Sequence, residues 1–388
     1  MTVKKDVFLK KKVAIIGASY LQVPLIECAQ KCGIETHVFA WECGDIGEKI
    51  ADHFYPISIV EKEKILEECR SIGISGVCSI ASDLAVVTVN YIANAMSLTG
   101  NSMKSTSKCT NKHLMRKAFE EYSLPSPKSI MVDSDTNLDN LELSYPVIVK
   151  PIDRSGSRGI FELDSSQNLK ESVETAVSES FAKKALIESF VEGAEYSVEY
   201  ISYHGEHHFL ALTQKYTTGS PHFIERGQLE PAIVDERLIG QIKQTVEKAL
   251  DSLEIVNGAS HSEIKIDPDG SIWLIEIGAR MGGDLIGSHL VKESTGIDMV
   301  KAVLQICLGM EPDLTAVSEH KTAGIRYIFD NNDLKCFRYI KENHPEILVQ
   351  YDIPSNYIGE INNSSQRKGY FVISDTEYNL INRLMPVK

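Results

Sequence analysis

The chain has 388 residues, of which 43% are hydrophobic and 24% are charged, and its formal net charge is −14. This composition is typical of a globular protein, and the length predicts two or three domains. The acidic balance argues against nucleic acid or an anionic membrane as the main partner. The apolar run after the basic start is too short for a signal peptide or a membrane span. We therefore expect a cytoplasmic protein.

The first hundred residues carry alternating strand and helix signals. The apolar runs VAIIG (13–17), THVFA (36–40) and GVCSIAS (76–82) are separated by stretches with helical periodicity. This pattern predicts a Rossmann-like parallel sheet with helices on both faces, over residues 1–104. Ligands bind at the carboxyl ends of such strands, which places Asp83 near a crevice. The turn GASYLQ lacks GxGxxG spacing, so we expect no dinucleotide site there.

Three further segments follow this domain. Residues 105–185 are expected to form a small α+β unit, in which GNSMKSTSKCTNK (100–112) is a polar linker before a helix. Residues 186–311 contain a long antiparallel meander, a covering helix and a final hairpin. Residues 312–388 are rich in short strands and are expected to form a small C-terminal subdomain.

The hairpin SHSEIKI-DPDG-SIWLIEI could hold a metal ion. The simplest register around its turn pairs Ile266 with Ser271, which places Glu263 diagonally from Glu276 on one face. Diagonal neighbours lie about 7 to 8 Å apart, a span that two glutamates can close around a hard cation. In this register Trp273 lies on the opposite, apolar face. An ordinary half-exposed hairpin with solvated charges is the alternative interpretation.

A phosphate site is predicted without a Walker motif, because GxxxxGK[ST] does not occur. Lys150 ends an apolar strand just before a loop with Ser155, Gly156 and Ser157, whose amide groups could close over phosphates. Lys112 begins the preceding helix. Taken singly, a plain turn and a solvated lysine are the commoner explanations of these features.

The motifs in order resemble those of the ATP-grasp superfamily of carboxylate–amine ligases. They are Lys112, VIVKP, SGSRG, IESFVEGAEYSVE, SEIK and EIGARMGG, and they cover nearly the whole chain. The fold implied is a Rossmann-like domain, an ATP-grasp fold of α/β and α+β character, and a β-rich C-terminal subdomain. HFIERGQLEP (222–231) and RMGGDLIG bring the chain closest to L-amino acid ligases and carbamoyl phosphate synthase-like single-chain ligases.

The resemblance implies a set of roles. Lys112 and Lys150 would hold the ATP phosphates under a lid formed by residues 155–159. The other implied roles are adenine binding by Glu188 and the backbone near Val191, ribose binding by Glu195, Mg²⁺ binding by Glu263 and Glu276 with Mn²⁺ as an alternative ion, and acyl phosphate contact by Arg280. The sequence departs from the family pattern at Gly278, where many relatives carry a metal-binding Asn, and at Gln228, where close relatives often carry His.

The implied reaction joins a carboxylate to an amine through an acyl phosphate, with Lys150 and Arg280 as catalytic residues and with release of ADP and phosphate. Small-molecule substrates, amino acids above all, are expected, and His222, Glu225 and Arg226 are candidates to contact them. Two alternatives stay open: activation of bicarbonate, as in biotin carboxylase or carbamoyl phosphate-forming enzymes, and a nucleotide-binding protein with a degenerate catalytic site. A homodimer is the first assembly to consider.

Overall fold

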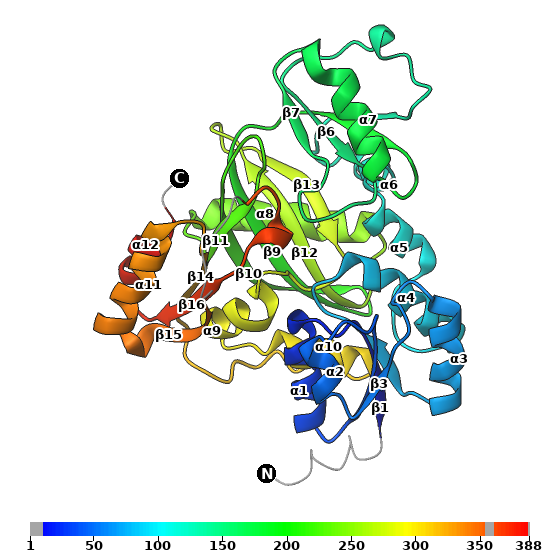
Figure 1. Ribbon diagram of the computed structural model, residues 1–388, viewed down its shortest axis with the longest axis vertical. Helices are drawn as coiled ribbons and strands as arrows, with labels where there is room; N and C mark the ends of the chain where they lie inside the picture. The colour runs from blue at the N-terminus through cyan, green and yellow to red at the C-terminus, as the bar shows by residue number, and fades with distance from the viewer. Residues whose placement is uncertain (1–10, 354–360, 387–388) are drawn as a thin grey trace.

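The N-terminal part of the chain forms a small parallel sheet between helices (Figure 1). The computed structural model describes residues 11–353 and 361–386. The strand order is β3-β2-β1-β4, and neighbouring strands run parallel. One face packs against α1 and the other against α3 and α4, which confirms the predicted sheet with helices on both faces. The elements are β1 (Lys12–Ile16), η1 (Tyr20–Gln22), α1 (Val23–Lys31), β2 (Glu35–Phe39), α2 (Ile46–Ile50), β3 (His53–Tyr55), α3 (Lys62–Ile72), β4 (Gly76–Cys78) and α4 (Asp83–Ala95).

Residues 100–112, which the sequence predicts to be a linker, contain a helix. This helix, α5 (Met103–Thr110), directly precedes α6 (Lys112–Glu121). Ser102 caps α5 by accepting a hydrogen bond from a backbone N–H of its first turn, and Cys109 packs in the core. Serine and threonine are weak helix formers, but tertiary packing overrides intrinsic propensity. The linker prediction was therefore wrong.

A second, four-stranded sheet stands at the top of the molecule, with α7 packed against it (Figure 1). Its strand order is β5-β8-β6-β7. The segment between β6 and β7 carries the serine- and glycine-rich loop of residues 155–159. The elements are β5 (Ser129–Val132), η2 (Leu138–Asn140), β6 (Val147–Pro151), β7 (Phe161–Leu163), η3 (Ser166–Asn168), α7 (Leu169–Glu179) and β8 (Ala185–Ser189).

The third sheet has eight antiparallel strands, in the order β13-β12-β9-β10-β11-β14-β16-β15. Together α6 and α8 cover one part of it, while α10 packs between it and the N-terminal sheet. Strands from residues 312–388 extend this same sheet. The elements are β9 (Ala194–Tyr203), β10 (Glu206–Thr217), β11 (Glu225–Glu230), α8 (Glu236–Ser252), β12 (Gly258–Ile266), β13 (Ile272–Gly278), the π-helix η4 (Ile286–Leu290), α9 (Val291–Thr295), α10 (Met299–Cys307), β14 (Thr322–Tyr327), α11 (Asn331–Asn343), η5 (Pro345–Ile347), β15 (Leu348–Asp352), η6 (Ser364–Gln366), β16 (Tyr370–Asp375) and α12 (Tyr378–Leu384). Among the described helices, none is long and apolar enough to cross a membrane.

The register of the β12–β13 hairpin differs from the simple prediction. Ile266 pairs with Ile272 rather than with Ser271, and Trp273 pairs with Lys265, so Trp273 lies on the polar face. This one-residue shift would separate Glu263 from Glu276, but a bulge between Glu263 and Ile264 restores their alignment. The two glutamates are direct cross-strand partners, not diagonal neighbours. A bulge adds one residue to one strand, which returns side chains to the original face.

Candidate active site

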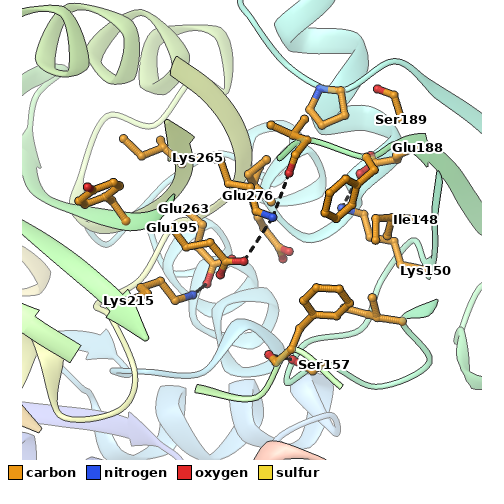
Figure 2. Close-up of a pocket in the computed structure, with 18 of the residues that line it drawn as sticks. Ile148, Lys150, Ser157, Glu188, Ser189, Glu195, Lys215, Glu263, Lys265 and Glu276 are labelled. Carbon is orange, nitrogen blue, oxygen red and sulfur yellow. Dashed lines mark hydrogen bonds and ion pairs between the residues drawn. The ribbon is translucent and has the colours of Figure 1, made fainter. Parts of the chain in front are cut away.

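A deep pocket lies between the sheet of β5–β8 and the eight-stranded sheet. It opens to solvent, and its cavity volume is about 140 Å³. Side chains from both sheets line it, and Figure 2 shows them converging from opposite sides. The predicted residues that line it are Lys150, Ser157, Glu188, Val191, Glu195, Glu225, Glu263 and Glu276.

Lys150 is held at the wall of this pocket by a buried carboxylate. Its Nζ lies 2.6 Å from Glu188 Oε2, and Arg116 Nε lies 2.8 Å from Glu188 Oε1. Burial opposes ionisation of Glu188, but the two cations outweigh burial and lower the pKa of its carboxyl. Burial also lowers the pKa of Lys150, an effect that Glu188 opposes. Because Glu188 holds two cations, the structure places it as their counter-ion.

Glu195 and the backbone at Val191 meet at one lysine. Lys265 Nζ lies 3.3 Å from Glu195 Oε1 and donates a hydrogen bond of 3.1 Å to the Val191 carbonyl oxygen. The same ammonium lies over the Phe190 ring, 5.0 Å from its centroid. The sequence prediction did not include Lys265 in the site, although its register on the face of Glu263 was a signal for it. This corner combines an aromatic face with polar groups.

Glu263 and Glu276 lie together, and each holds a lysine. Lys215 Nζ is 2.7 Å from Glu263 Oε1, and Lys112 Nζ is 2.8 Å from Glu276 Oε1. Burial opposes ionisation of Glu263, yet Lys215 and His261 hold its pKa well below the usual range. Two carboxylates paired across neighbouring strands fit a hard cation such as Mg²⁺, which prefers oxygen ligands. The residues present therefore fit the implied metal ion.

A buried glutamate–histidine pair braces this hairpin from β9. Glu199 is fully buried, and its Oε1 lies 2.5 Å from His261 Nδ1, while its Oε2 accepts a hydrogen bond from the Gly282 N–H. Burial disfavours the charged imidazole, but Glu199 outweighs burial and raises the pKa of His261 to about 9. His261 Nε2 lies 3.6 Å from Glu263 Oε1. On β13, His261 pairs with Gly278.

A second chamber adjoins the first, and Ser157, Lys215, Glu225, Glu263 and Glu276 line both. Its other walls come from the N-terminal sheet, the loop of residues 154–157, the segment after β13 and the C-terminal segment. Most of its lining side chains are polar or charged. The predicted residues that line this chamber but not the first are Lys112, Ser155, Gly156 and Arg280.

Arg280 is clamped by Asp83, the first residue of α4 in the N-terminal part of the chain. Its Nε and Nη2 donate to the two oxygens of Asp83 at 2.8 and 3.0 Å, a bidentate geometry. Burial opposes ionisation of Asp83, but Arg280 outweighs it and lowers the pKa of the Asp83 carboxyl. A Cβ atom at Gly278 would lie 2.9 Å from Asp83 Oδ1. Asp83 therefore occupies space that a side chain at position 278 would need.

The C-terminal segment also supplies a cation to this chamber. Arg367 forms a bidentate pair with Asp284, at 2.6 and 2.9 Å, and donates to the Glu225 carbonyl oxygen at 3.2 Å. Burial raises the pKa of the Glu225 carboxyl, although Lys215 opposes this effect. The sequence prediction named no functional residue in this segment. An arginine just before a buried strand was a signal, but its partner is 83 positions away.

Two predicted substrate residues lie outside the described chambers. His222 is exposed on the segment before β11. Arg226 follows Glu225 on β11, so its side chain points to the other face, where it lies over Phe329 and 3.9 Å from Asp333. The segment after β13 is irregular, because Asp284 and Leu285 have left-handed backbone and a π-helix follows.

Comparisons with known proteins agree with this geometry. Residues 143–288 match the family model of the ATP-grasp domain. Alanine–anticapsin ligase of Bacillus subtilis is 25% identical over 307 residues, which cover 70% of this chain and 64% of that enzyme. The match thus spans less than two thirds of this relative. The carbamoyl phosphate synthase large chain of Caldanaerobacter subterraneus subsp. tengcongensis is 23% identical over 270 residues, 68% of this chain and 24% of that protein.

Solved structures agree over nearly the full length. The L-amino acid ligase from Bacillus licheniformis superposes with a TM-score of 0.81 and 25% identity, covering 97% of this chain and 96% of that one. A phosphoribosylglycinamide synthetase from Anaerococcus prevotii gives a TM-score of 0.75 at 20% identity, with 96% of each chain covered, and shares the fold. Residues 143–288 therefore match the ATP-grasp domain, and the chain as a whole shares its fold with the L-amino acid ligase.

Proposed function

We propose that this chain is an ATP-dependent carboxylate–amine ligase that forms an amide or peptide bond between small molecules, amino acids above all. The observation that carries the proposal is the pair of adjoining chambers with Glu263 and Glu276 in their common wall. One chamber has the lining expected for a nucleotide, with apolar side chains at one end and lysines at the other. The other contains both acidic side chains and guanidinium groups, which suit a substrate with an amine and a carboxylate.

ATP would occupy the first chamber. Ile148, Phe190 and Ile275 offer apolar contact to the adenine, and the backbone at Val191 offers hydrogen bonds. Glu195 is placed for the ribose hydroxyls. Glu188 would act as the counter-ion that orients Lys150, since it already binds two cations.

The phosphates would lie near the common wall. Lys150 and Lys112 bring positive charge from two sides, and the loop of residues 155–157 offers backbone N–H groups. Glu263 and Glu276 would hold Mg²⁺ through oxygens that also face the lysines. When bound, Mg²⁺ supplies charge neutralisation for the transferred phosphoryl group.

The reaction would proceed in two steps. A substrate carboxylate oxygen attacks the γ-phosphorus of ATP, the bond to the β–γ bridging oxygen breaks, and ADP leaves. The amine nitrogen then attacks the acyl carbon, the bond to the phosphate oxygen breaks, and the nitrogen loses a proton. Glu225, whose carboxyl pKa is raised by burial, is placed to receive that proton. Arg280 would stabilise the oxyanion of the tetrahedral intermediate.

A phosphate-release screen over pairs of amino acids tests the proposal, with ATP and Mg²⁺ present in every well. The expected result is release that requires both a carboxylate and an amine, with the ligated product confirmed by mass spectrometry. Release with bicarbonate alone would instead identify a bicarbonate-activating enzyme. ATP binding without phosphate release against the whole panel would identify a nucleotide-binding protein and reject the ligase proposal.

A further inference from the structure

A cluster of two histidines and a glutamate lies on the N-terminal sheet, away from both chambers. Glu35 and His37 are two residues apart on β2, and His53 pairs with His37 from the edge strand β3. Glu35 begins β2, so the cluster lies toward the amino ends of the strands, whereas Asp83 and the chambers lie at their carboxyl ends. In Figure 1 this sheet is at the bottom of the molecule.

The ligand atoms of the cluster converge on one point. His37 Nε2 lies 3.0 Å and His53 Nε2 lies 3.1 Å from the same oxygen, Glu35 Oε1. All three ligand atoms lie within 4.8 Å of one another. Two ligands of a tetrahedral zinc ion, each about 2 Å from the metal, lie about 3.3 Å apart. The rings of His37 and His53 are stacked with their planes 15° apart, so the side chains must turn before both nitrogens can point at one ion. The spacing of the ligand atoms needs no rearrangement of the backbone.

His37 has a buried nitrogen that makes no hydrogen bond. Its side chain is 4% exposed, and within the described residues its Nε2 makes no regular hydrogen bond, although Glu35 Oε1 lies 3.0 Å away. A buried polar nitrogen without a partner costs free energy, which a ligand would recover. The other ring nitrogen, Nδ1, lies 3.1 Å from the Tyr55 hydroxyl. Metal-binding histidines are commonly held through the second ring nitrogen in this way.

A second cluster shows by contrast what makes this one informative. Cys43, Asp45 and Glu48 also lie close together, but Glu48 accepts hydrogen bonds from three backbone N–H groups and Asp45 caps α2. Those carboxylates are engaged in shaping a helix terminus. Glu35, in contrast, faces two imidazoles, and its β1 neighbour Lys12 donates to the Ile72 carbonyl oxygen.

We infer that Glu35, His37 and His53 bind one divalent transition-metal ion, with Zn²⁺ as the fitting representative. Imidazole and carboxylate ligands suit ions of the zinc and copper part of the series, whereas Mg²⁺ avoids imidazole. The three ligands leave a coordination position open to water, because the His53 and Glu35 side chains are 51% and 41% exposed. The ion would fasten the three-residue edge strand β3 to β2.

Zinc retention by the full-length chain tests this inference. Chelator-treated protein is mixed with Zn²⁺ in excess Mg²⁺, which occupies the Glu263–Glu276 site, and retained zinc is measured after gel filtration. The expected result is one equivalent in the wild type and none in His53→Ala or Glu35→Gln, both changes at partly exposed side chains. Tyr55→Phe should weaken zinc binding by roughly 10- to 100-fold, the usual effect of losing a group that orients a ligand.

Matched variants separate this site from other zinc ligands. His320→Ala removes an exposed histidine elsewhere, and Cys43→Ser disables the second cluster, so both should retain one equivalent. With Co²⁺ as the probe, the spectrum should show no thiolate charge-transfer band. Absence of zinc retention in the wild type, or loss of zinc in Cys43→Ser but not in His53→Ala, would overturn the inference. Ligase activity in His53→Ala should be unchanged, because the cluster lies outside both chambers.

Discussion

Gly278→Ala tests whether the Asp83–Arg280 clamp positions Arg280 for catalysis. The new Cβ would lie 2.9 Å from Asp83 Oδ1 and 3.1 Å from Arg280 Nε, both shorter than ordinary van der Waals contact. The backbone at Gly278 is not left-handed, so alanine meets no conformational barrier there. The methyl group must therefore displace one or both partners of an ion pair whose Nε to Oδ1 distance is 2.8 Å.

The loss of turnover in Gly278→Ala should not exceed the loss caused by removing the Arg280 guanidinium altogether. Removing an oxyanion donor costs about 2.7 to 4 kcal/mol, or on the order of a hundredfold to a thousandfold in turnover, which is the loss we expect for Arg280→Ala. Gly278→Ala retains the guanidinium but displaces it, so we expect a smaller loss, about tenfold to a hundredfold. The assay is steady-state phosphate release with the substrate pair identified by the screen.

A double-mutant cycle tests whether Gly278→Ala acts through the Asp83–Arg280 ion pair. In Asp83→Ala the carboxylate is absent, so adding Gly278→Ala should cost little more, and the two effects should be far from additive. Gly240→Ala is the matched control, because no atom lies within 4 Å of its added Cβ and it lies in the exposed part of α8. Additive losses, or an unchanged rate in Gly278→Ala, would show that the clamp does not position Arg280.

Three further predictions follow from the two chambers and the core. Glu276→Gln should raise the Mg²⁺ concentration needed for half-maximal phosphate release, whereas Glu247→Gln, on α8, should not. The same dependence of phosphate release on Mg²⁺ in both variants would contradict the assignment of Glu276 as a metal ligand. Arg367→Met should raise KM for an amino acid substrate at least tenfold and change KM for ATP little. The matched control is Arg338→Met, at an exposed arginine. A change in KM for ATP alone would reject the placement of Arg367 in the substrate chamber. Burial raises the pKa of Glu230 from 4.5 to about 7, despite hydrogen bonds from Ser294 and Thr213. The stabilising contribution of Glu230 is complete below pH 4.5 and is lost as the pH rises through about 7. Glu230→Gln should therefore increase the unfolding free energy relative to wild type by up to about 3 kcal/mol at pH 8.5 and have little effect at pH 4.5. Urea denaturation at both pH values measures this difference, and a difference that does not depend on pH would contradict the prediction.

The sequence predicted the local elements well where one periodicity dominated. Apolar runs ending in Gly17 and preceding Asp83 identified the parallel sheet and its crevice, because buried parallel strands are nearly continuous in hydrophobicity. Helix α5 was missed because most of its side chains are small and polar, so its sequence has no apolar helical periodicity. Its burial depends on neighbours that are distant in the chain. Local patterns report local forces, and this helix is stabilised by packing.

In the candidate site, too, some residues could be identified from local sequence and others depend on contacts between distant segments. Lys112, Lys150, Glu263 and Glu276 could be named because the ordered set of motifs around them resembles that of a known family. Asp83, Lys215 and Arg367 could not be given roles, since each depends on a partner that another element brings from a distance, such as Arg280 for Asp83.

The hairpin explains why a correct residue pair can follow from an incorrect register. The turn fixes the pairing of Ile266 with Ile272, and continued regularly this register would place Glu263 and Glu276 on opposite faces. The extra residue of β13 opposite the Glu263–Ile264 step shifts the register by one and returns Glu263 and Glu276 to the same face. The turn therefore sets the pairing on one side of the bulge, and the bulge sets it on the side that carries the two carboxylates. A bulge carries no periodic signal in the sequence, because both its flanks remain alternating. It is nevertheless the feature that brings the two predicted metal ligands face to face.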